Sequence, residues 1–208
     1  MQTSLASPAR SFLAAVAFAA AALSPAFADE SAEAFVSQIL VEANSVFGAA
    51  DVETRNAGIE TLVDKYVDMN RVARFALGQY ARVATDEQMA VYRPLFRKYA
   101  TSVYQSTLDA YTGETLEVTG SVDRSARDII VNSKVVGAKP GGQYADLVVH
   151  WRVYRAGDGA QTIVDAGASG VWLAIEQQST FKSVIANNGG GAAGIDALIA
   201  DLKAKVGE

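Results

Sequence analysis

The side chains that most often perform catalysis are scarce in this sequence. Its 208 residues include one histidine, His150, and no cysteine, which excludes disulfides, thiolate metal ligands and cysteine nucleophiles. The segment "GASG" around Ser169 resembles a nucleophile elbow, but the G-x-S-x-G pattern requires glycine at the position of Val171. A serine hydrolase would also need His150 as its base, held in place by a third group. We predict that neither residue is catalytic and that the protein is not an enzyme.

Two other patterns could indicate a cofactor or a metal. The run "GGGAAG" over Gly189–Gly194 matches G-x-G-x-x-G, but a dinucleotide site also needs a further strand and an acidic residue about 20 residues on. Only 14 residues follow Gly194, so we expect a loop between two helices. Asp64 and Asp68 share a helical face, yet they lack the spacing of a calcium loop and indicate a solvated surface. We therefore expect no cofactor and no metal.

The N-terminal segment has the three parts of a secretory signal peptide. Arg10 precedes an apolar run over residues 12–23, and "AFA" at residues 26–28 is a small-residue cleavage site. The run is too short to cross a hydrocarbon layer of ~30 Å, which favours a cleaved signal peptide over residues 1–28 rather than a membrane anchor. Residues 29–208 then form a single domain, because a chain of this size buries about 70% of its unfolded surface in one core.

The overall charge bears on possible partners. The formal net charge is −5, and no basic stripe runs along the sequence. Proteins that bind nucleic acid carry such a stripe as their electrostatic footprint. We therefore expect no nucleic-acid partner.

The first half of the chain has apolar residues at helical spacing. Helices are predicted over residues 34–47, 58–67 and 69–77. Asp68 can cap the third of these, and Thr85 with Gln88 forms a capping box that opens a long helix reaching Tyr111. Pro94 lies inside that helix and predicts a kink there, because proline removes a backbone hydrogen bond and clashes with the preceding turn.

In the second half the apolar period changes from 3.6 to 2, which is typical of strands. Four strands are predicted, over residues 115–122, 128–137, 144–154 and 161–175. Along the third strand, Val149 and Trp151 share one face, whereas Val148 and His150 share the other. Two helices, over residues 179–186 and 195–205, close the chain. The predicted fold is α+β, with N-terminal helices packed on one face of a four-stranded antiparallel twisted sheet and with C-terminal helices after it.

Short motifs occur along the chain in an order that resembles one known family. The first half supplies Asp68, Leu77-Gly78, Tyr80 with Arg82, Thr85 with Gln88, and the aromatic stretch Tyr104 to Tyr111. The second half supplies Asp165, Gly170–Leu173, Ser179–Phe181, and Gly194–Ile199 with Leu202. Together they resemble the periplasmic phospholipid-binding MlaC family, also called the toluene-tolerance auxiliary family. The chain departs from the family at Trp172, where Ser is usual, at "EQQS" over residues 176–179, where an Arg-Ser pair is common, and in a longer loop over residues 187–194.

The resemblance implies a soluble lipid carrier of the periplasm. Such a carrier takes phospholipid between an outer-membrane lipoprotein complex and an inner-membrane ABC transporter of the Mla system, which maintains outer-membrane lipid asymmetry. We expect a monomer with the acyl chains in an apolar pocket between sheet and helices and the headgroup in water. Each exposed CH₂ costs ~0.8 kcal/mol, so a chain of about 16 carbons costs on the order of 13 kcal/mol in water.

The pocket wall is expected to come from apolar and aromatic residues of the long helix and of the sheet, with a volume at or above the upper end of ~300–1,000 Å³. The expected lipid-binding residues are Phe75, Phe96, Tyr99, Val103, Val149, Trp151, Val153 and Trp172. Three alternatives remain open at this point. They are a carrier for hopanoid or another lipid, an exported serine hydrolase that uses Ser169 and His150, and an interaction module with a solid core and no ligand.

Overall fold

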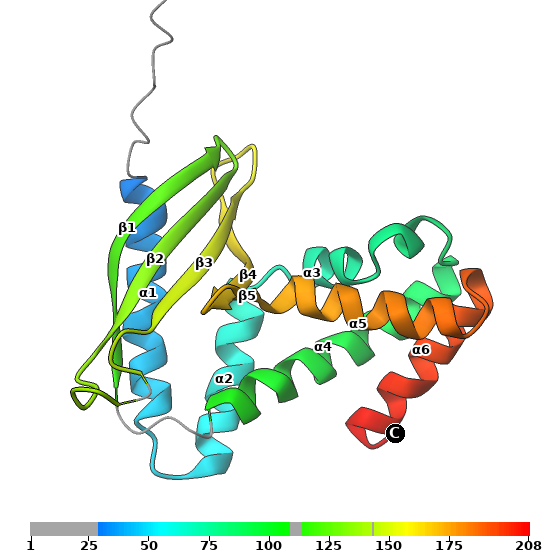
Figure 1. Ribbon diagram of the computed structural model, residues 1–208, viewed down its shortest axis with the longest axis horizontal. Helices are drawn as coiled ribbons and strands as arrows, with labels where there is room; N and C mark the ends of the chain where they lie inside the picture. Colours follow the sequence, from blue (N-terminus) through cyan, green and yellow to red (C-terminus); the bar gives the residue numbers. More distant parts are fainter. Residues whose placement is uncertain (1–28, 109–113, 143) are drawn as a thin grey trace, which may run out of the picture.

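The computed structural model describes residues 29–108, 114–142 and 144–208, in which a group of helices is followed by a group of strands and then by further helices (Figure 1). The helices are α1 (Glu30–Phe47), α2 (Val52–Tyr66), α3 (Met69–Ala76), α4 (Asp86–Leu108), α5 (Leu173–Asn187) and α6 (Gly191–Val206), with a short 3-10 helix η1 (Gly78–Arg82) after α3. The strands are β1 (Thr115–Ser125), β2 (Asp128–Val136), β3 (Val148–Arg155), β4 (Gln161–Ala168) and β5 (Val171–Trp172). They form one antiparallel sheet in sequence order, so the predicted α+β class is confirmed.

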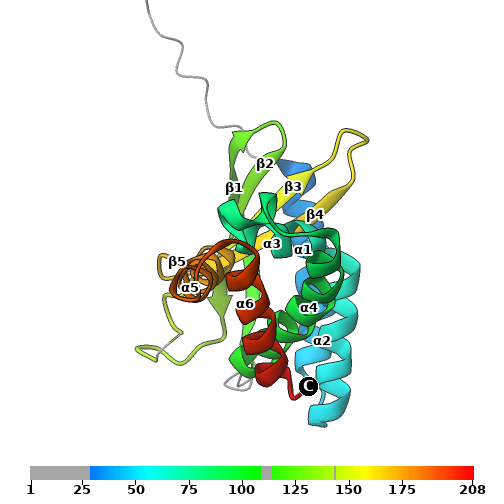
Figure 2. The ribbon, with the colours of Figure 1, turned by 90° about the vertical axis from the view of Figure 1, so that its right-hand side faces the viewer.

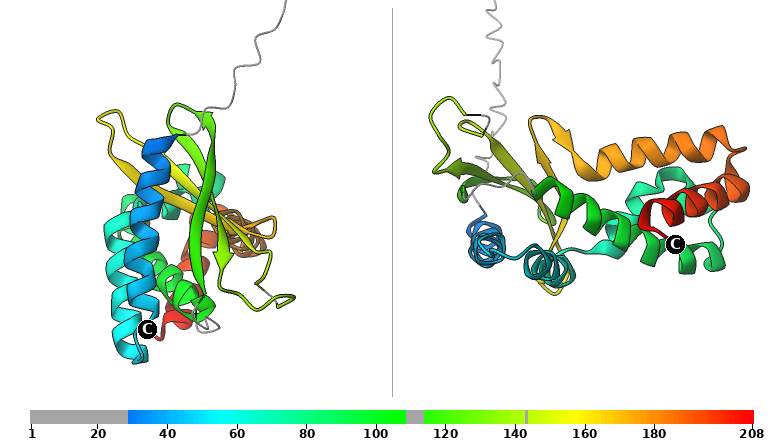
Figure 3. Two further views of the ribbon diagram at one scale, coloured as in Figure 1. Left: turned by 90° about the vertical axis from the view of Figure 1, so that its left-hand side faces the viewer. Right: turned by 90° about the horizontal axis from the view of Figure 1, so that it is seen from below.

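Two bodies of the molecule are visible in the views from the left and from below (Figure 3). In the first, α1 and α2 lie on one face of the sheet. In the second, α3, α4, α5 and α6 extend away from the sheet edge, with α5 and α6 next to one another and α4 between α6 and α2 (Figure 2). Each body has its own cluster of buried residues, which we call the sheet core and the helical core. The sheet core contains Val36, Leu40, Ile129, Val131 and Val153, and the helical core contains Leu77, Tyr92, Phe96, Phe181 and Leu198.

The helix starts follow the local rules of the sequence. The predicted cap at Asp68 is confirmed, because its carboxylate accepts the N–H of Arg71 at 2.9 Å. The predicted capping box is also confirmed, since Thr85 and Gln88 each donate a backbone N–H to the other's side-chain oxygen at 3.2 Å. The Gln88 amide then donates to Asp196 of α6 at 2.7 Å. A single local motif therefore starts α4 and also joins it to α6.

The long helix differs little from its prediction. Helix α4 runs without interruption from Asp86 to Leu108 and includes Pro94. The kink at Pro94 stays a prediction. Its predicted end at Tyr111, like the predicted signal peptide over residues 1–28, lies outside the described residues. Among the described helices, none is long and apolar enough to cross a membrane.

The last predicted strand is the main error in secondary structure. Residues 161–175 were expected to form one strand, but β4 ends at Ala168 and a turn follows in which Ser169 has φ of 52°. Helix α5 begins at Leu173, well before the predicted start at residue 179. The cause is a tertiary cap, because the Asp165 carboxylate of β4 accepts the N–H of Ala174 at 2.9 Å. The sheet therefore has five strands rather than four.

Candidate functional site

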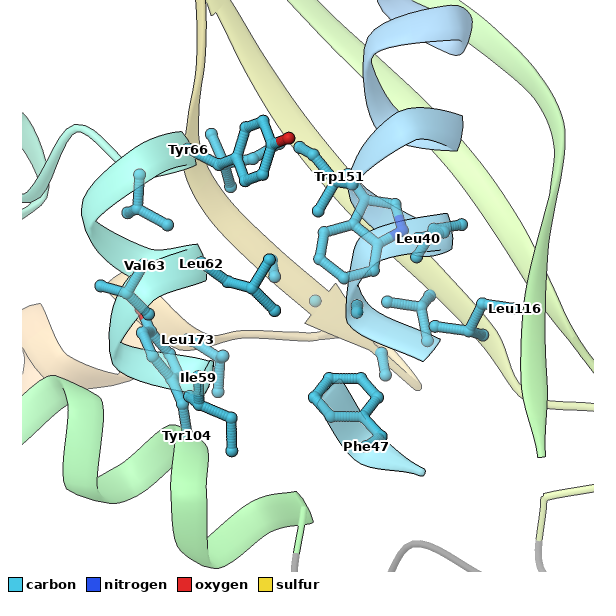
Figure 4. A pocket seen from close by; sticks show the side chains of 18 of the residues that line it. Leu40, Phe47, Ile59, Leu62, Val63, Tyr66, Tyr104, Leu116, Trp151 and Leu173 are labelled. Carbon is cyan, nitrogen blue, oxygen red and sulfur yellow. The ribbon is translucent and has the colours of Figure 1, made fainter. Parts of the chain in front are cut away.

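A cavity of about 410 Å³ lies between the sheet and the pair of helices α1 and α2, and the end of α4 closes one side (Figure 4). Its lining is almost entirely apolar. The helical walls include Leu40, Phe47, Ile59, Leu62, Val63 and Tyr66, the sheet contributes Leu116, Val149 and Trp151, and α4 and α5 add Tyr104 and Leu173. The volume falls in the lower half of the range of ~300–1,000 Å³ for ligand pockets. The expectation of a volume at the upper end was therefore wrong, because large side chains such as Phe47 and Trp151 project into the space.

The periodicity of each element explains why these side chains meet. In α2, Ile59, Leu62, Val63 and Tyr66 recur at helical spacing and therefore share one face. In β3, the alternation of a strand places Trp151 on the face that contacts the helices, while Val148 points away and is 40% exposed. The predicted assignment of the two faces of this strand agrees with the structure.

The polar end of Trp151 is satisfied within the sheet. Its indole N–H donates to the Ser133 hydroxyl at 2.9 Å, and that hydroxyl donates to the Val149 carbonyl at 3.2 Å. Ser133 is fully buried, so both hydrogen bonds are shielded from water. Because a buried indole N–H normally needs a partner, this arrangement leaves the apolar ring free to line the cavity.

Helices α1 and α2 are joined by polar groups beside the cavity. The Tyr66 hydroxyl donates to the Glu42 carboxylate at 2.6 Å, and Lys65 forms an ion pair with Glu42 at 2.9 Å. The hydrogen bond from Tyr66, together with that from Lys65, lowers the pKa of the Glu42 carboxyl below its ordinary value. The two helices are therefore fixed to one another by side chains, and the apolar face of each is directed to the sheet.

Two polar residues stand among the mainly apolar residues that line the cavity near the sheet edge. Asp165 of β4 is buried, and its burial raises the pKa of the carboxyl despite the N–H groups of Ala174 and Ala166. Tyr104 of α4 also lines the cavity, and its burial, with a further contribution from the Asp165 charge, raises the pKa of its phenol to about 12. The phenol therefore remains protonated at neutral pH and is available as a hydrogen-bond donor.

Polar lining residues also gather where α1 ends and β1 begins. Asn44 lies in the last turn of α1, and Glu114 and Thr115 lie at the start of β1. The N-terminal end of α1 is held at the other end of the same strand, where the backbone N–H of Asp29 donates to the Ser121 hydroxyl at 2.7 Å. The cavity therefore has one end with polar groups, and the rest of its wall is mainly apolar.

The residues considered for catalysis do not form a catalytic site. His150 lies on the other face of the sheet, where its Nδ1 is 2.7 Å from the Asn132 amide oxygen and its ring stacks on Trp172. No hydrogen bond joins it to Ser169, which lies in the turn after β4, in the part of the chain that the structure describes. Over residues 29–108, 114–142 and 144–208, no group of three or more potential ligands could hold a metal ion.

The eight residues expected to bind lipid are divided by the structure. Val149 and Trp151 line the cavity. Val153 is fully buried in the sheet core, Phe96 is buried in the helical core, and Tyr99 packs against Phe181 in that same helical core. The other three also lie outside the lining. They are Phe75, exposed on α3, Val103, half-buried on α4, and Trp172, which stacks on His150.

The wall opposite Val149 was therefore assigned to the wrong helix. The expected partner was the stripe of α4 that contains Phe96, but α4 extends away from the sheet and packs this stripe against α5 and α6. Only the end of α4, at Tyr104, reaches the cavity. The residues that were missed lie on α1 and α2, and their periodic apolar stripes were visible in the sequence without indicating which element they face.

Comparisons with known proteins agree with this fold. The family model described as MlaC protein matches residues 34–204, so the chain belongs to this family. A solved structure with a similar fold is the phospholipid-binding protein from Ralstonia solanacearum, determined in complex with a phospholipid. It is 22% identical, with a TM-score of 0.68, and the match covers 85% of this chain and 97% of that one. No curated protein matches the chain.

Proposed function

We propose that this MlaC-family chain binds phospholipid, with acyl chain in the cavity between the sheet and the helices α1 and α2. The observation that carries the proposal is the cavity of about 410 Å³ with its almost entirely apolar lining. The phospholipid bound to the Ralstonia protein of similar fold supports the choice of ligand. The headgroup would lie at the polar end near Asn44 and Thr115, in contact with water.

We further propose that the protein is a periplasmic carrier that enters that compartment through a cleaved signal peptide over residues 1–28. It would act as a monomer and carry phospholipid between an outer-membrane lipoprotein complex and an inner-membrane ABC transporter, and so maintain outer-membrane lipid asymmetry. Membership of the MlaC family supports this role. The physical reason for a carrier is the cost of an acyl chain in water, on the order of 13 kcal/mol for about 16 carbons.

The test is to identify what the purified protein carries. The chain is produced in a bacterial host with its signal peptide, purified from the periplasm, and examined by native mass spectrometry and by organic extraction. We expect stoichiometric glycerophospholipid, and extraction would distinguish it from a hopanoid or another lipid. Folded protein that is free of lipid and takes none up from phospholipid vesicles would contradict the proposal.

A further inference from the structure

The first turn of α1 is tied to a strand that lies far away in the sequence. Helix α1 begins beside β1 (Figure 1), and the backbone N–H of Asp29 donates to the Ser121 hydroxyl of β1 at 2.7 Å. The same hydroxyl donates to the carboxylate of Glu33, in the first turn of α1, also at 2.7 Å. One oxygen atom of the sheet therefore contacts both the nitrogen of Asp29 and the carboxylate of Glu33.

This shared contact holds the nitrogen and the carboxylate close together. Each is 2.7 Å from the Ser121 oxygen, so the two cannot be farther apart than twice that distance. A positive charge on the nitrogen would then lie within the ~4–6 Å over which an opposite charge stabilises it. Ser121 and Glu33 are both half-buried, so water screens such an interaction less than it would at an exposed site.

The other carboxylates of this turn are either paired already or in solvent. The Asp29 carboxylate accepts the N–H of Ala32 at 2.9 Å and forms an ion pair with Arg155 of β3 at 2.6 Å. Burial opposes the ionisation of this carboxyl, but the hydrogen bonds from Arg155 and Ala32 hold its pKa below the ordinary value. Glu30 is exposed. Among the described residues, Glu33 is held by the sheet and forms no ion pair.

Cleavage of the signal peptide changes the group that faces Glu33. The predicted cleavage site ends at Ala28, so cleavage there converts the N–H of Asp29 into an α-ammonium group. A positive charge at the start of a helix is unfavourable, because the helix macrodipole is positive at that end. A carboxylate beside the ammonium group offsets this cost, and Glu33 lies where such a carboxylate is needed.

We propose that the Ser121 hydroxyl and the Glu33 carboxylate bind the α-ammonium group released by cleavage after Ala28, and that cleavage thereby strengthens the attachment of α1 to the sheet. This inference rests on the part of the proposed function that concerns the cleaved signal peptide. Helix α1 supplies Leu40 and Phe47 to the wall of the cavity. The new N-terminus is therefore a structural part of the lipid-binding domain rather than a free end.

The first measurement establishes where the chain is cut. The protein is produced with its signal peptide and purified from the periplasm, and its intact mass is determined by mass spectrometry. We expect the mass of residues 29–208. Cleavage at another bond would overturn the inference, because the ammonium group would then not be on Asp29. Lipid extracted from the same sample tests the proposed lipid binding separately.

The second measurement removes the charge and keeps the hydrogen bond. An acetyl group on Asp29 leaves one hydrogen on the nitrogen, as in the uncleaved chain. The mature protein is unfolded in guanidinium chloride, acetylated at pH about 6.5, where the α-amino group reacts ahead of lysine because its ordinary pKa is lower, and refolded. We expect acetylation to lower the equilibrium constant for folding about threefold in urea denaturation, as for a partly exposed ion pair. A constant that does not fall would contradict the inference.

Two variants and one control assign the effect to the proposed partners. Glu33→Gln keeps an oxygen that can accept from Ser121 but removes the charge, so acetylation should no longer lower the constant. In Ser121→Ala the effect should fall below about twofold, because the oxygen that both groups contact is lost. Glu30→Gln removes an exposed carboxylate from the same turn and should keep the full effect.

The possible failures are distinguishable. An effect of acetylation that is equal in Glu33→Gln and in the wild type would overturn the inference, and Ser121→Ala decides the question if Glu33→Gln does not fold. A wild type that shows the threefold effect but carries no lipid and takes none up from phospholipid vesicles would leave the N-terminal site standing and contradict the proposed lipid binding.

Discussion

The helical core and the cavity are built from the same kinds of side chain, yet one is filled and the other is hollow. In the helical core, the rings of Tyr92, Phe96 and Phe181 lie 5.7 to 6.4 Å apart, centroid to centroid. A glycine, Gly194, lets α6 approach α5 so closely that an added Cβ would lie 2.3 Å from the Ile185 carbonyl oxygen. Around the cavity, the side chains of Phe47, Leu62 and Trp151 point toward an open space of about 410 Å³.

The difference shows that an apolar stripe specifies burial but not what fills the space beside it. Small residues such as Ala73, Ala76 and Gly194 allow the helices of the helical core to close together. Between α2 and the sheet the space stays open, although small residues such as Ala166, Gly167 and Ala168 also line its sheet wall. Four substitutions or pairs of substitutions test this comparison.

The largest effect is expected from removing the same side chain in the two regions. Leu198 is fully buried in the helical core, so Leu198→Ala should lower the free energy of unfolding by about 3–5 kcal/mol, because it creates a new void in a filled core. Leu62→Ala enlarges a space that already exists and should cost about 1 kcal/mol. Urea denaturation of lipid-free protein measures both. Equal costs would show that the two regions are equally well packed.

A second pair tests the cavity wall through lipid binding. In Val149→Glu a carboxylate enters the apolar space, where burying a charge costs several kcal/mol, so phospholipid affinity should fall at least about tenfold. Val148→Glu changes the next residue, which points to the other face and is 40% exposed, and should alter binding little. Lipid mass spectrometry and thermal melting compare the two. Similar binding by both variants would mean that the cavity face of β3 is assigned wrongly.

A smaller effect is expected from filling the space beside two glycines. In Gly194→Ala the new methyl meets the Ile185 backbone, which cannot move alone, and overpacking of this kind costs about 1–3 kcal/mol. In Gly58→Ala the new methyl meets a side chain, Val46, at the contact between α1 and α2. Alanine also favours a helix over glycine by about 1 kcal/mol, so this variant should be near neutral. If thermal melting shows the Gly58 variant to be the less stable, the helical core is not the tighter region.

The smallest effect is expected at Asp165, which lies where the two regions meet. Burial raises the pKa of this carboxyl in the folded state, so between its unfolded and folded pKa values the native state binds more protons. The wild type should therefore gain stability relative to Asp165→Asn as the pH falls from neutral through the folded pKa toward about 4. Urea denaturation of both proteins across this range measures the difference. A difference that does not change with pH would mean that Asp165 is not titrating in a buried site.

Features set by neighbours in the sequence could be predicted, whereas features set by distant contacts could not. The cap at Asp68 and the capping box at Thr85 depend on residues three positions away, and both are present. The faces of β3 follow from its alternation, which placed Val149 and Trp151 correctly on the cavity side. The start of helix α5 depends on the carboxylate of Asp165 in strand β4, and no local sequence pattern indicates this start.

The same reasoning explains the outcome for the candidate site. A helical period shows which stripe of α4 is buried, but the identity of the covering element is a tertiary property. Phe96 was therefore expected on the pocket wall, whereas it lies in the helical core. The predicted helices over residues 34–47 and 58–67 contain Phe47 and Leu62, but neither residue was expected in the cavity wall, since a hollow interior and a solid interior have the same periodicity.

The cavity also has a mechanical consequence for the molecule. Unfolding eliminates internal voids, so a protein with a large void has a smaller molar volume when unfolded and is destabilised by hydrostatic pressure. If the apolar space of about 410 Å³ between the sheet and α1–α2 stays dry when no ligand fills it, this chain will be sensitive to pressure. A bound acyl chain would fill the void and so remove much of the decrease in molar volume that accompanies unfolding. The pressure at which the protein unfolds would then report the fraction of molecules whose cavity holds an acyl chain.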